Sequence, residues 1–282
     1  MNRATLLNIG LLLLVGALIT LVRYQTDEGR TGVSTPLTSL TTSEVKRIEI
    51  QRLGRDTIEL QKTDTQWRLL RPTDHPANTF RVGALLELTT TPSRSRYSVN
   101  EADLAALGLE PAQITLQLDQ LTLRFGDSEP LNHYRYVIVG ETIHLIDDLT
   151  YLHLSADWSR FVSPTLLSAE RLNHIALPDR TLQLDSDQHW QLSPSEIVMD
   201  GDAITALVES WQGAEAIEVT PYRDEPSIAT ITLTPRGGDT ITLKMLATTP
   251  ELILARAELG IRYHFSAEQA AALLPNLTTE LK

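Results

Sequence analysis

Three acidic residues of this sequence have the spacing of calcium ligands. Asp185, Asp187 and Glu196 occupy the first, third and twelfth positions of one segment, and these positions supply oxygen ligands in an EF-hand loop. The sixth position of such a loop requires a glycine for its sharp turn, and here it holds Trp190. We therefore interpret the segment as a polar hairpin turn before a strand, and predict no metal site there.

The histidines and glycines give no stronger signal for catalysis. His133, His144 and His153 are 11 and 9 residues apart, whereas a zinc protease places two imidazoles four residues apart on one helix. The string PRGGD at residues 235–239 lies between two alternating patterns with no helix after it. A hairpin turn is therefore favoured over a phosphate-binding loop. We expect no metal or other cofactor.

One cluster of aromatic and basic residues is a candidate contact surface. His133, Arg135 and Tyr136 belong to the string HYRY in a chain that has few aromatic residues. Arginine and tyrosine are favoured at binding hot spots, so we predict an exposed cluster that contacts a partner protein or a glycan. Cross-strand pairing of these side chains within a sheet is the alternative.

The composition limits the partners and the chemistry of the chain. The 282 residues carry a formal net charge of −12 and include no cysteine. Disulfides, thiolate nucleophiles and zinc–thiolate sites are therefore excluded. Lysine and arginine form no cluster in the sequence, and an acidic surface repels a polyanion, so we expect no nucleic-acid partner.

The N-terminal region predicts a membrane anchor. Residues 4–22 are uncharged and apolar and have an arginine at each end. A helix of this length matches the hydrocarbon core of a bilayer, so we predict an uncleaved signal anchor over residues 1–25. A signal peptide cleaved near residues 15–17 is the alternative. Residues 26–42 are rich in Thr, Ser and Gly and predict a flexible linker. The part of the chain after the linker would lie in the periplasm, held by a single transmembrane span in the cytoplasmic membrane.

One phrase occurs twice in the remaining sequence. The string TDTQWRLLRP around Trp67 recurs as SDQHWQLSP around Trp190. Around each Trp, strand patterns, a helical pattern and four further strand patterns follow in the same order. We therefore predict an α+β fold of two duplicated lobes, residues 43–165 and 166–282. Each lobe would be a mainly antiparallel sheet with one or two helices packed on it, and the second would be a degenerate repeat.

Helical spacing and capping residues predict where the helices lie. Asn78 or Thr79 would cap a helix whose apolar face begins with Phe80. Asp200 or Asp202 would cap the corresponding helix of the second lobe. Residues 100–108 predict a short helix that the second lobe lacks, and residues 267–275 predict a terminal helix.

These features together resemble a known family. The strings WRLLRP, LAALGLEPAQITLQLDQLTLRF and IHLID follow one another after an N-terminal apolar segment, and this order resembles the bacterial domain-of-unknown-function 4340 family. The resemblance covers nearly all of the chain after residue 42. It implies a membrane-anchored envelope protein, in some relatives encoded beside ABC-type transport systems, and it implies no catalytic residues.

The sequence thus leaves three functions open. The first is a non-enzymatic accessory module that contacts another envelope protein, such as a component of an ABC-type transporter. The second is a module that binds a lipid, glycan or small molecule between its lobes. The third is a periplasmic hydrolase whose catalytic residues are dispersed along the chain.

Overall fold

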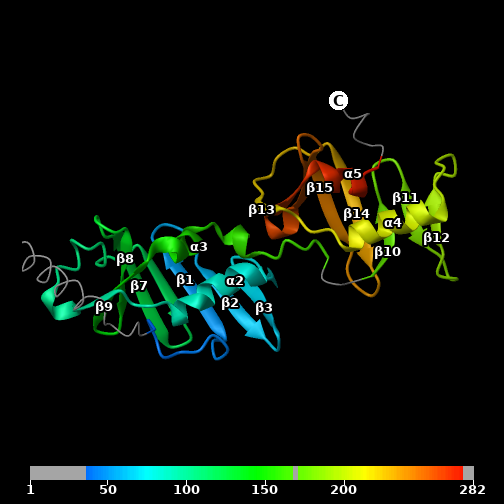
Figure 1. Cartoon of the computed structure of the whole chain (residues 1–282). Coiled ribbons are helices and arrows are strands. Elements are labelled where there is room, and N and C mark those ends of the chain that lie inside the picture. Colours follow the sequence, from blue (N-terminus) through cyan, green and yellow to red (C-terminus); the bar gives the residue numbers. More distant parts are fainter. Residues whose placement is uncertain (1–35, 168–170, 276–282) are drawn as a thin grey trace, which may run out of the picture.

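The structure is a computed structural model that describes residues 36–167 and 171–275. Two lobes lie in series, each built on one antiparallel sheet (Figure 1). The α+β class and the two lobes predicted from sequence are therefore confirmed. No helix within these described ranges has the length and hydropathy needed to span a bilayer. The predicted anchor lies outside the described residues.

The first sheet has nine strands in the order β4-β3-β2-β1-β6-β7-β8-β9-β5. Neighbouring strands are antiparallel. Along β1, β2 and β6, buried apolar residues alternate with more exposed residues, as the period of two requires. The strands are β1 (Arg47–Arg52), β2 (Ile58–Thr63), β3 (Gln66–Arg71), β4 (His75–Pro76), β5 (Ser95–Ser98), β6 (Ile114–Leu118), β7 (Leu121–Ser128), β8 (Tyr134–Val139) and β9 (Thr142–Asp147).

The second sheet has eight strands in the order β12-β11-β10-β14-β15-β16-β17-β13. They are β10 (Leu172–Ala176), β11 (Thr181–Leu184), β12 (Trp190–Ser193), β13 (Glu218–Pro221), β14 (Ala229–Pro235), β15 (Ile241–Ala247), β16 (Leu252–Arg256) and β17 (Ile261–Phe265). Without the two-residue β4, the strands of the two sheets correspond one for one, in chain order and in space.

The correspondence between the sheets explains the phrase that occurs twice. Trp67 lies on β3 and Trp190 on β12, which are equivalent strands. His144 on β9 and His264 on β17 are likewise on equivalent strands. Trp67 is buried, whereas Trp190 packs against the core and stays partly exposed. The two lobes therefore share the same strand order, but the two matched tryptophans are buried to different degrees.

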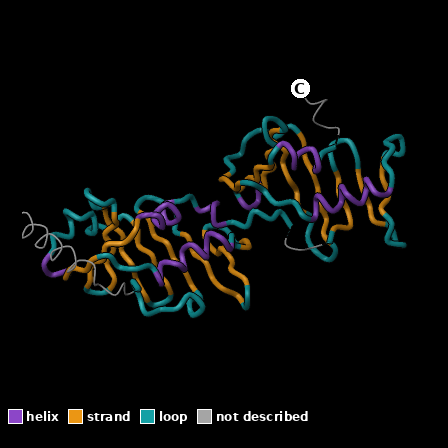
Figure 2. The backbone as a smooth tube through the Cα atoms, viewed as in Figure 1, coloured by secondary structure: helices purple, strands orange, loops and turns teal. Residues whose placement is uncertain are grey.

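Helices cover one face of each sheet (Figures 1 and 2). The first lobe has α2 (Thr79–Leu86) and α3 (Tyr151–Ser155), and the second has α4 (Gly201–Gln212) and α5 (Ala267–Leu273). Asn78 caps α2 and Asp200 caps α4, each by accepting a backbone N–H bond, as the sequence predicts. The expected core role of Phe80 is wrong, because its side chain is 74% exposed while Val82 and Leu85 face the core.

The helix predicted over residues 100–108 is also absent from the structure. The chain forms a 3-10 helix at Val99–Glu101, capped by Ser98, and then turns through Gly108, whose φ is +65°. This segment places Leu109 over the sheet, where it packs with Ile138 and Ile143. Gly108 therefore ends the segment where the sequence predicts an end, but residues 102–107 form turns instead of a helix.

The predicted flexible linker is wrong in its last part. Leu37 is buried, and its backbone N–H donates to the carbonyl of Thr91 at 2.7 Å. The hydroxyl of Thr38 donates to the carbonyl of Thr89 at 3.2 Å. The chain from residue 36 onward is therefore packed on the first lobe, because Leu37 contributes to the core of that lobe.

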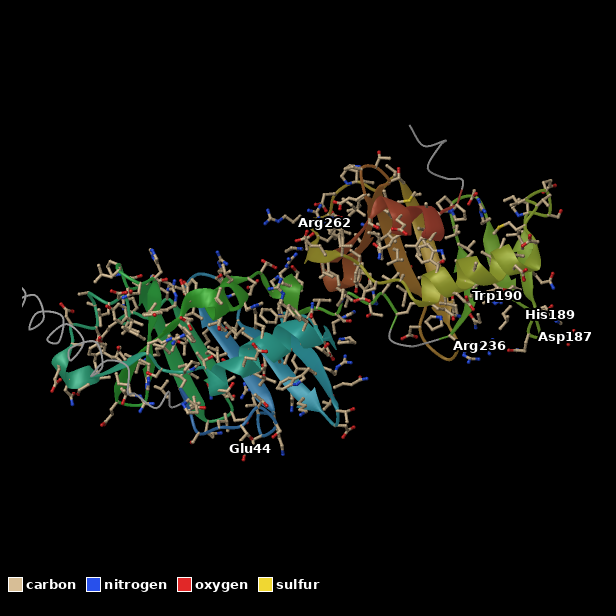
Figure 3. All side chains as sticks on the ribbon, viewed as in Figure 1. Glu44, Asp187, His189, Trp190, Arg236 and Arg262 are labelled. Atoms are coloured by element: carbon tan, nitrogen blue, oxygen red, sulfur yellow. The ribbon has the colours of Figure 1, made fainter. Side chains whose placement is uncertain are left out.

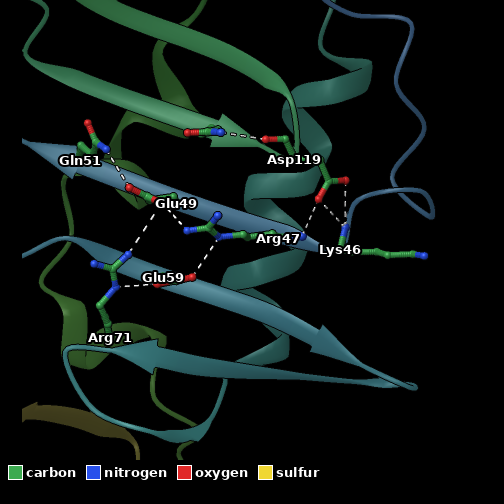
Figure 4. A network of polar contacts seen from close by, with 8 residues as sticks. Lys46, Arg47, Glu49, Gln51, Glu59, Arg71 and Asp119 are labelled. Carbon is green, nitrogen blue, oxygen red and sulfur yellow. Dashed lines mark hydrogen bonds and ion pairs between the residues drawn. The ribbon is translucent and has the colours of Figure 1, made fainter.

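One face of the first sheet carries a network of cross-strand ion pairs (Figure 4). Glu49 and Glu59 are directly opposite each other on β1 and β2. Arg47 contacts both carboxylates at 2.9 Å, and Arg71 donates to Glu59 at 2.5 Å. Two adjacent carboxylates could serve acid–base chemistry, but here each is neutralised by an arginine. The network is therefore a stabilising feature of the sheet.

The segment that connects the lobes is hydrogen-bonded to both sheets. On the side of the first lobe, the backbone N–H of Asn78 donates to Phe161 and that of Ser163 donates to Pro76, both at 2.8 Å. On the side of the second lobe, the backbone N–H of Ala216 donates to Pro164 at 2.9 Å. Residues 156–167, the junction segment, thus occupy the edges of both sheets, at β4 and at β13.

Candidate functional site

The predicted contact cluster is not an exposed cluster. Arg135 is 7% exposed and forms an ion pair with Asp148. Its guanidinium also donates to the carbonyl of Gly126 at 2.5 Å and lies 3.5 Å from the ring centre of Tyr151. Tyr136 packs against the small cluster around Leu109. The prediction of exposure is therefore wrong for Arg135, because its charge is satisfied inside the sheet.

The remaining residue of that cluster is exposed. His133 lies in the turn between β7 and β8 with a φ of +59°. Its backbone N–H donates to the carbonyl of Glu129 at 3.1 Å. A contact between His133 or Tyr136 and a partner stays a prediction.

The calcium-like string forms the hairpin turn predicted for it. Asp185 accepts backbone N–H bonds from Asp187 and His189 at 2.9 Å, and β11 pairs with β12 on either side of the turn. Asp187 and His189 project from the end of the second lobe (Figure 3). Across residues 36–167 and 171–275, no three His, Asp or Glu side chains are close enough to hold a metal ion.

The described residues form several hollows where the two lobes meet. One, of about 290 Å³, is lined by Phe80 and Arg81 from the first lobe and by Ile217 and Glu218 from the second. A second, of about 430 Å³, is lined by His75 from the first lobe and by residues of β16 and its neighbours. Because residues from both lobes line each hollow, the lobe junction is the candidate functional site.

Two exposed apolar side chains line the first hollow, and a third lies on α3, which packs against α2. Phe80 is 74% exposed, Leu152 is 69% exposed and Ile217 is 63% exposed. The ring of Phe80 packs edge-on against His153, with the ring centres 6.3 Å apart, and Leu152 precedes His153 on α3. We call Phe80, Leu152 and Ile217 the junction patch. Removing exposed apolar side chains from water is favourable, so a group of them on the surface marks a site where another molecule can bind.

The hollow beside the junction patch is lined by two arginines, Arg81 and Arg160, and by two glutamates, Glu215 and Glu218. Arg81 donates to Nδ1 of His153 at 2.9 Å, and Arg160 forms an ion pair with Glu218. A guanidinium can only donate, so Nδ1 of His153 must be unprotonated in this contact. Burial and then the charge of Arg160 lower the pKa of Arg81. No carboxylate contacts Arg81 within the part of the chain that the structure describes.

The second hollow contains a buried polar pair that joins the lobes. His75 is 6% exposed, and its Nε2 lies 3.4 Å from the hydroxyl oxygen of Tyr263. Its Nδ1 lies 3.1 Å from the carbonyl of Pro76. Burial lowers the pKa of His75 and raises the pKa of Tyr263 to about 12. The neutral imidazole therefore accepts from the tyrosine hydroxyl and donates to the carbonyl.

Because the folded chain disfavours a charged His75, we expect stability to fall in mild acid. The pKa of His75 is lower in the folded chain than in the unfolded chain. The contribution of neutral His75 to stability is therefore complete above about pH 6.5 and is lost as the pH falls below that value. The loss from one group is at most about 1.4 kcal/mol per pH unit. Urea unfolding between pH 7.5 and 5 measures this slope, and His75→Gln should reduce it.

The matched variant for this experiment is Tyr263→Phe. It removes the hydroxyl and keeps the imidazole, so it should lower stability by about 1 kcal/mol at pH 7.5 and keep the slope. The slope should not vanish in His75→Gln, since burial also lowers the pKa of His144 and of His153. An unchanged slope in His75→Gln would show that folding leaves the pKa of His75 unshifted.

The residues of the junction were not found from the sequence. Phe80 is expected on the apolar face of the helix because it stands close to Val82 and Leu85 in the sequence, but a period of 3.6 residues places it on the opposite side of α2. His75 and Tyr263 are 188 positions apart, and neither belongs to a motif. The one available signal was the equivalence of the two lobes, which does not specify how the lobes meet.

Comparison with known proteins gives one match. A family model described as "Domain of unknown function (DUF4340)" matches residues 67–235, which is more than half of the chain. The match begins at Trp67 on β3 and ends at Pro235 on β14, so it includes the whole junction segment. The chain matches no curated protein and no solved structure.

Proposed function

From the premise that the chain belongs to the DUF4340 family, a family of unknown function, we propose that it is a membrane-anchored interaction module. Its folded part would lie outside the cytoplasmic membrane, in the periplasm, as an accessory of an envelope complex such as an ABC-type transporter. The junction patch would be the surface that contacts the partner. The exposure of Phe80 and Ile217 in one hollow, with that of Leu152 on the adjoining helix α3, carries this proposal.

The helical side of the first lobe gives the patch its rigidity. Phe80 projects from α2, and the opposite side of that helix is fixed by buried Val82 and Leu85. Leu152 projects from α3, which packs against α2. Side chains on fixed helices lose little further freedom when they bind, so such positions suit a contact surface.

The charges beside the patch suggest what kind of segment would bind. Arg81 has a histidine as its side-chain partner rather than a carboxylate. A partner segment with two apolar side chains and one carboxylate would bury the patch and pair with Arg81. The hollow of about 290 Å³ has room for one or two such side chains.

Site-specific photo-crosslinking in native membranes tests the proposal. A benzophenone amino acid at Leu152 should give a discrete adduct with an integral membrane protein. Phe80→Asp should lower the adduct yield at least about 10-fold, since removing a central aromatic contact costs about 2 kcal/mol or more.

Two exposed apolar residues outside the patch provide controls. Leu131 and Val198 are both highly exposed, at 84% and 93%. The benzophenone at Val198 should give no adduct, and Leu131→Asp should leave the Leu152 adduct unchanged. If Phe80→Asp also leaves that adduct unchanged, the junction patch is not the contact surface.

A further inference from the structure

A third hollow at the junction, of about 590 Å³, brings together arginines from both lobes. Arg52 ends β1 and Arg55 follows it in the turn to β2, whereas Arg223 follows β13. The two acidic side chains of the lining, Asp56 and Asp157, leave an excess of one positive charge. We propose that this hollow, the arginine site, binds a phosphate group.

Arg52 is the most buried of the three arginines. Its terminal nitrogens donate to the carbonyls of Ala156 and Asp56, but its Nε is buried with no hydrogen-bond partner. Burial and then the charge of Arg55 lower the pKa of Arg52. A buried N–H group without a partner is rare in folded proteins, and a missing ion or water is one of its usual causes. An anion in the hollow would offset the repulsion between the two guanidinium groups.

Arg55 and Arg223 have N–H groups that no protein group accepts among the described residues. Arg55 uses one terminal nitrogen to donate to the carbonyl of Ser155 at 3.0 Å. The side chain of Arg223 makes no hydrogen bond or ion pair with the described residues, and both guanidinium groups reach the surface. A guanidinium matches two oxygens of a phosphate with two parallel N–H bonds. A phosphate between Arg55 and Arg223 would therefore bridge the lobes.

The charges of Asp157 and Asp56 partly offset the lowering of the pKa of Arg52, but neither carboxylate forms an ion pair with an arginine of the hollow among the described residues. Asp157 accepts the backbone N–H of Ser159 at 3.0 Å and so caps a 3-10 helix. The hollow is larger than one phosphate group needs, and the half-buried indole of Trp158 forms part of its wall. The ligand class is therefore a phosphate monoester carried by a larger group, either a soluble metabolite or a lipid headgroup. This inference does not depend on the junction patch.

Isothermal titration calorimetry of the full chain in an uncharged detergent tests the arginine site. One arm uses glycerol 3-phosphate, and the other uses phosphatidic acid in micelles of the same detergent. We expect saturable binding below about 1 mM in at least one arm. The double variant Arg55→Gln, Arg223→Gln should weaken that binding at least about 10-fold, because it removes the charged donors of both lobes.

A double variant with the same change of charge is the control. Arg171→Gln, Arg236→Gln also removes two positive charges, from exposed positions of the second lobe away from the arginine site (Figure 3 labels Arg236). It should bind within about twofold of the parent chain. Binding in the glycerol phosphate arm would identify a soluble ligand, and binding in the phosphatidic acid arm alone would identify a lipid. No saturable binding in either arm, or equal binding by both double variants, would overturn the inference.

Discussion

Trp211→Ala is expected to destabilise the second lobe by about 3–5 kcal/mol. Trp211 is the largest fully buried side chain of the described residues, and it lies on α4 where that helix meets α5. Its Nε1 donates to the carbonyl of Leu273 at 3.0 Å. The substitution removes the apolar contact and leaves that buried carbonyl without its donor. Urea unfolding followed by circular dichroism, with hydrogen exchange to assign the lobe, measures the effect.

Two further variants separate the causes of this loss. Trp211→Phe keeps most of the ring and loses only the N–H bond and part of the volume, so it should lose about 1–2 kcal/mol. Trp190→Ala should be milder than Trp211→Ala, because Trp190 lies on the edge strand β12 and is partly exposed. Equal losses in Trp190→Ala and Trp211→Ala would mean that burial does not set the energetics of this lobe.

Arg135→Ala is expected to lower the stability of the first lobe by about 3 kcal/mol or more. The substitution removes a buried guanidinium that pairs with Asp148, donates to the carbonyl of Gly126 and stacks on Tyr151. The aspartate and the carbonyl would both be left without this partner, and breaking a buried pair from one side has this magnitude. Thermal and urea unfolding of the variant give the measurement.

The adjacent aspartate provides the control for this prediction. Asp147 pairs with Arg94 at 2.8 Å, and both side chains are about half exposed. Arg94→Ala should therefore change stability by less than about 1 kcal/mol. Equal losses in the two variants would contradict the structural role of Arg135. Any loss of partner binding in Arg135→Ala must be compared with its loss of folded protein, because the side chain is inside the sheet.

The repeating part of the fold was predictable from local patterns. Alternating apolar residues identified the strands, and Asn78 and Asp200 identified two helix starts, because period and capping are properties of neighbouring residues. The match of Trp67 with Trp190 predicted two similar lobes, and equivalent strands carry them. The prediction failed at Phe80, which a period of 3.6 residues places opposite to Val82 and Leu85 on α2, and in residues 102–107, which form turns instead of a helix.

The candidate site was not predictable in this way. The arginine site combines Arg52 and Arg55 with Arg223, which no motif connects. The exposure of Phe80 follows from its position on the side of α2 opposite to Val82 and Leu85, whereas its closeness to Ile217 depends on where the second lobe lies. Arg135 shows the opposite error: its residue type suggested a surface contact, whereas a carboxylate on the neighbouring strand end holds it inside. Each of these outcomes is set by tertiary contacts between distant segments.

The junction segment has a mechanical consequence. A linker that makes no contacts with the two domains it connects lets each domain rotate independently of the other. Here the connecting chain is bonded to an edge of each sheet, through Ser163 and Pro76 on one side and Ala216 and Pro164 on the other. Bending the protein between the two lobes would break several of these backbone hydrogen bonds together. A rotation imposed on one lobe would therefore be transmitted to the other.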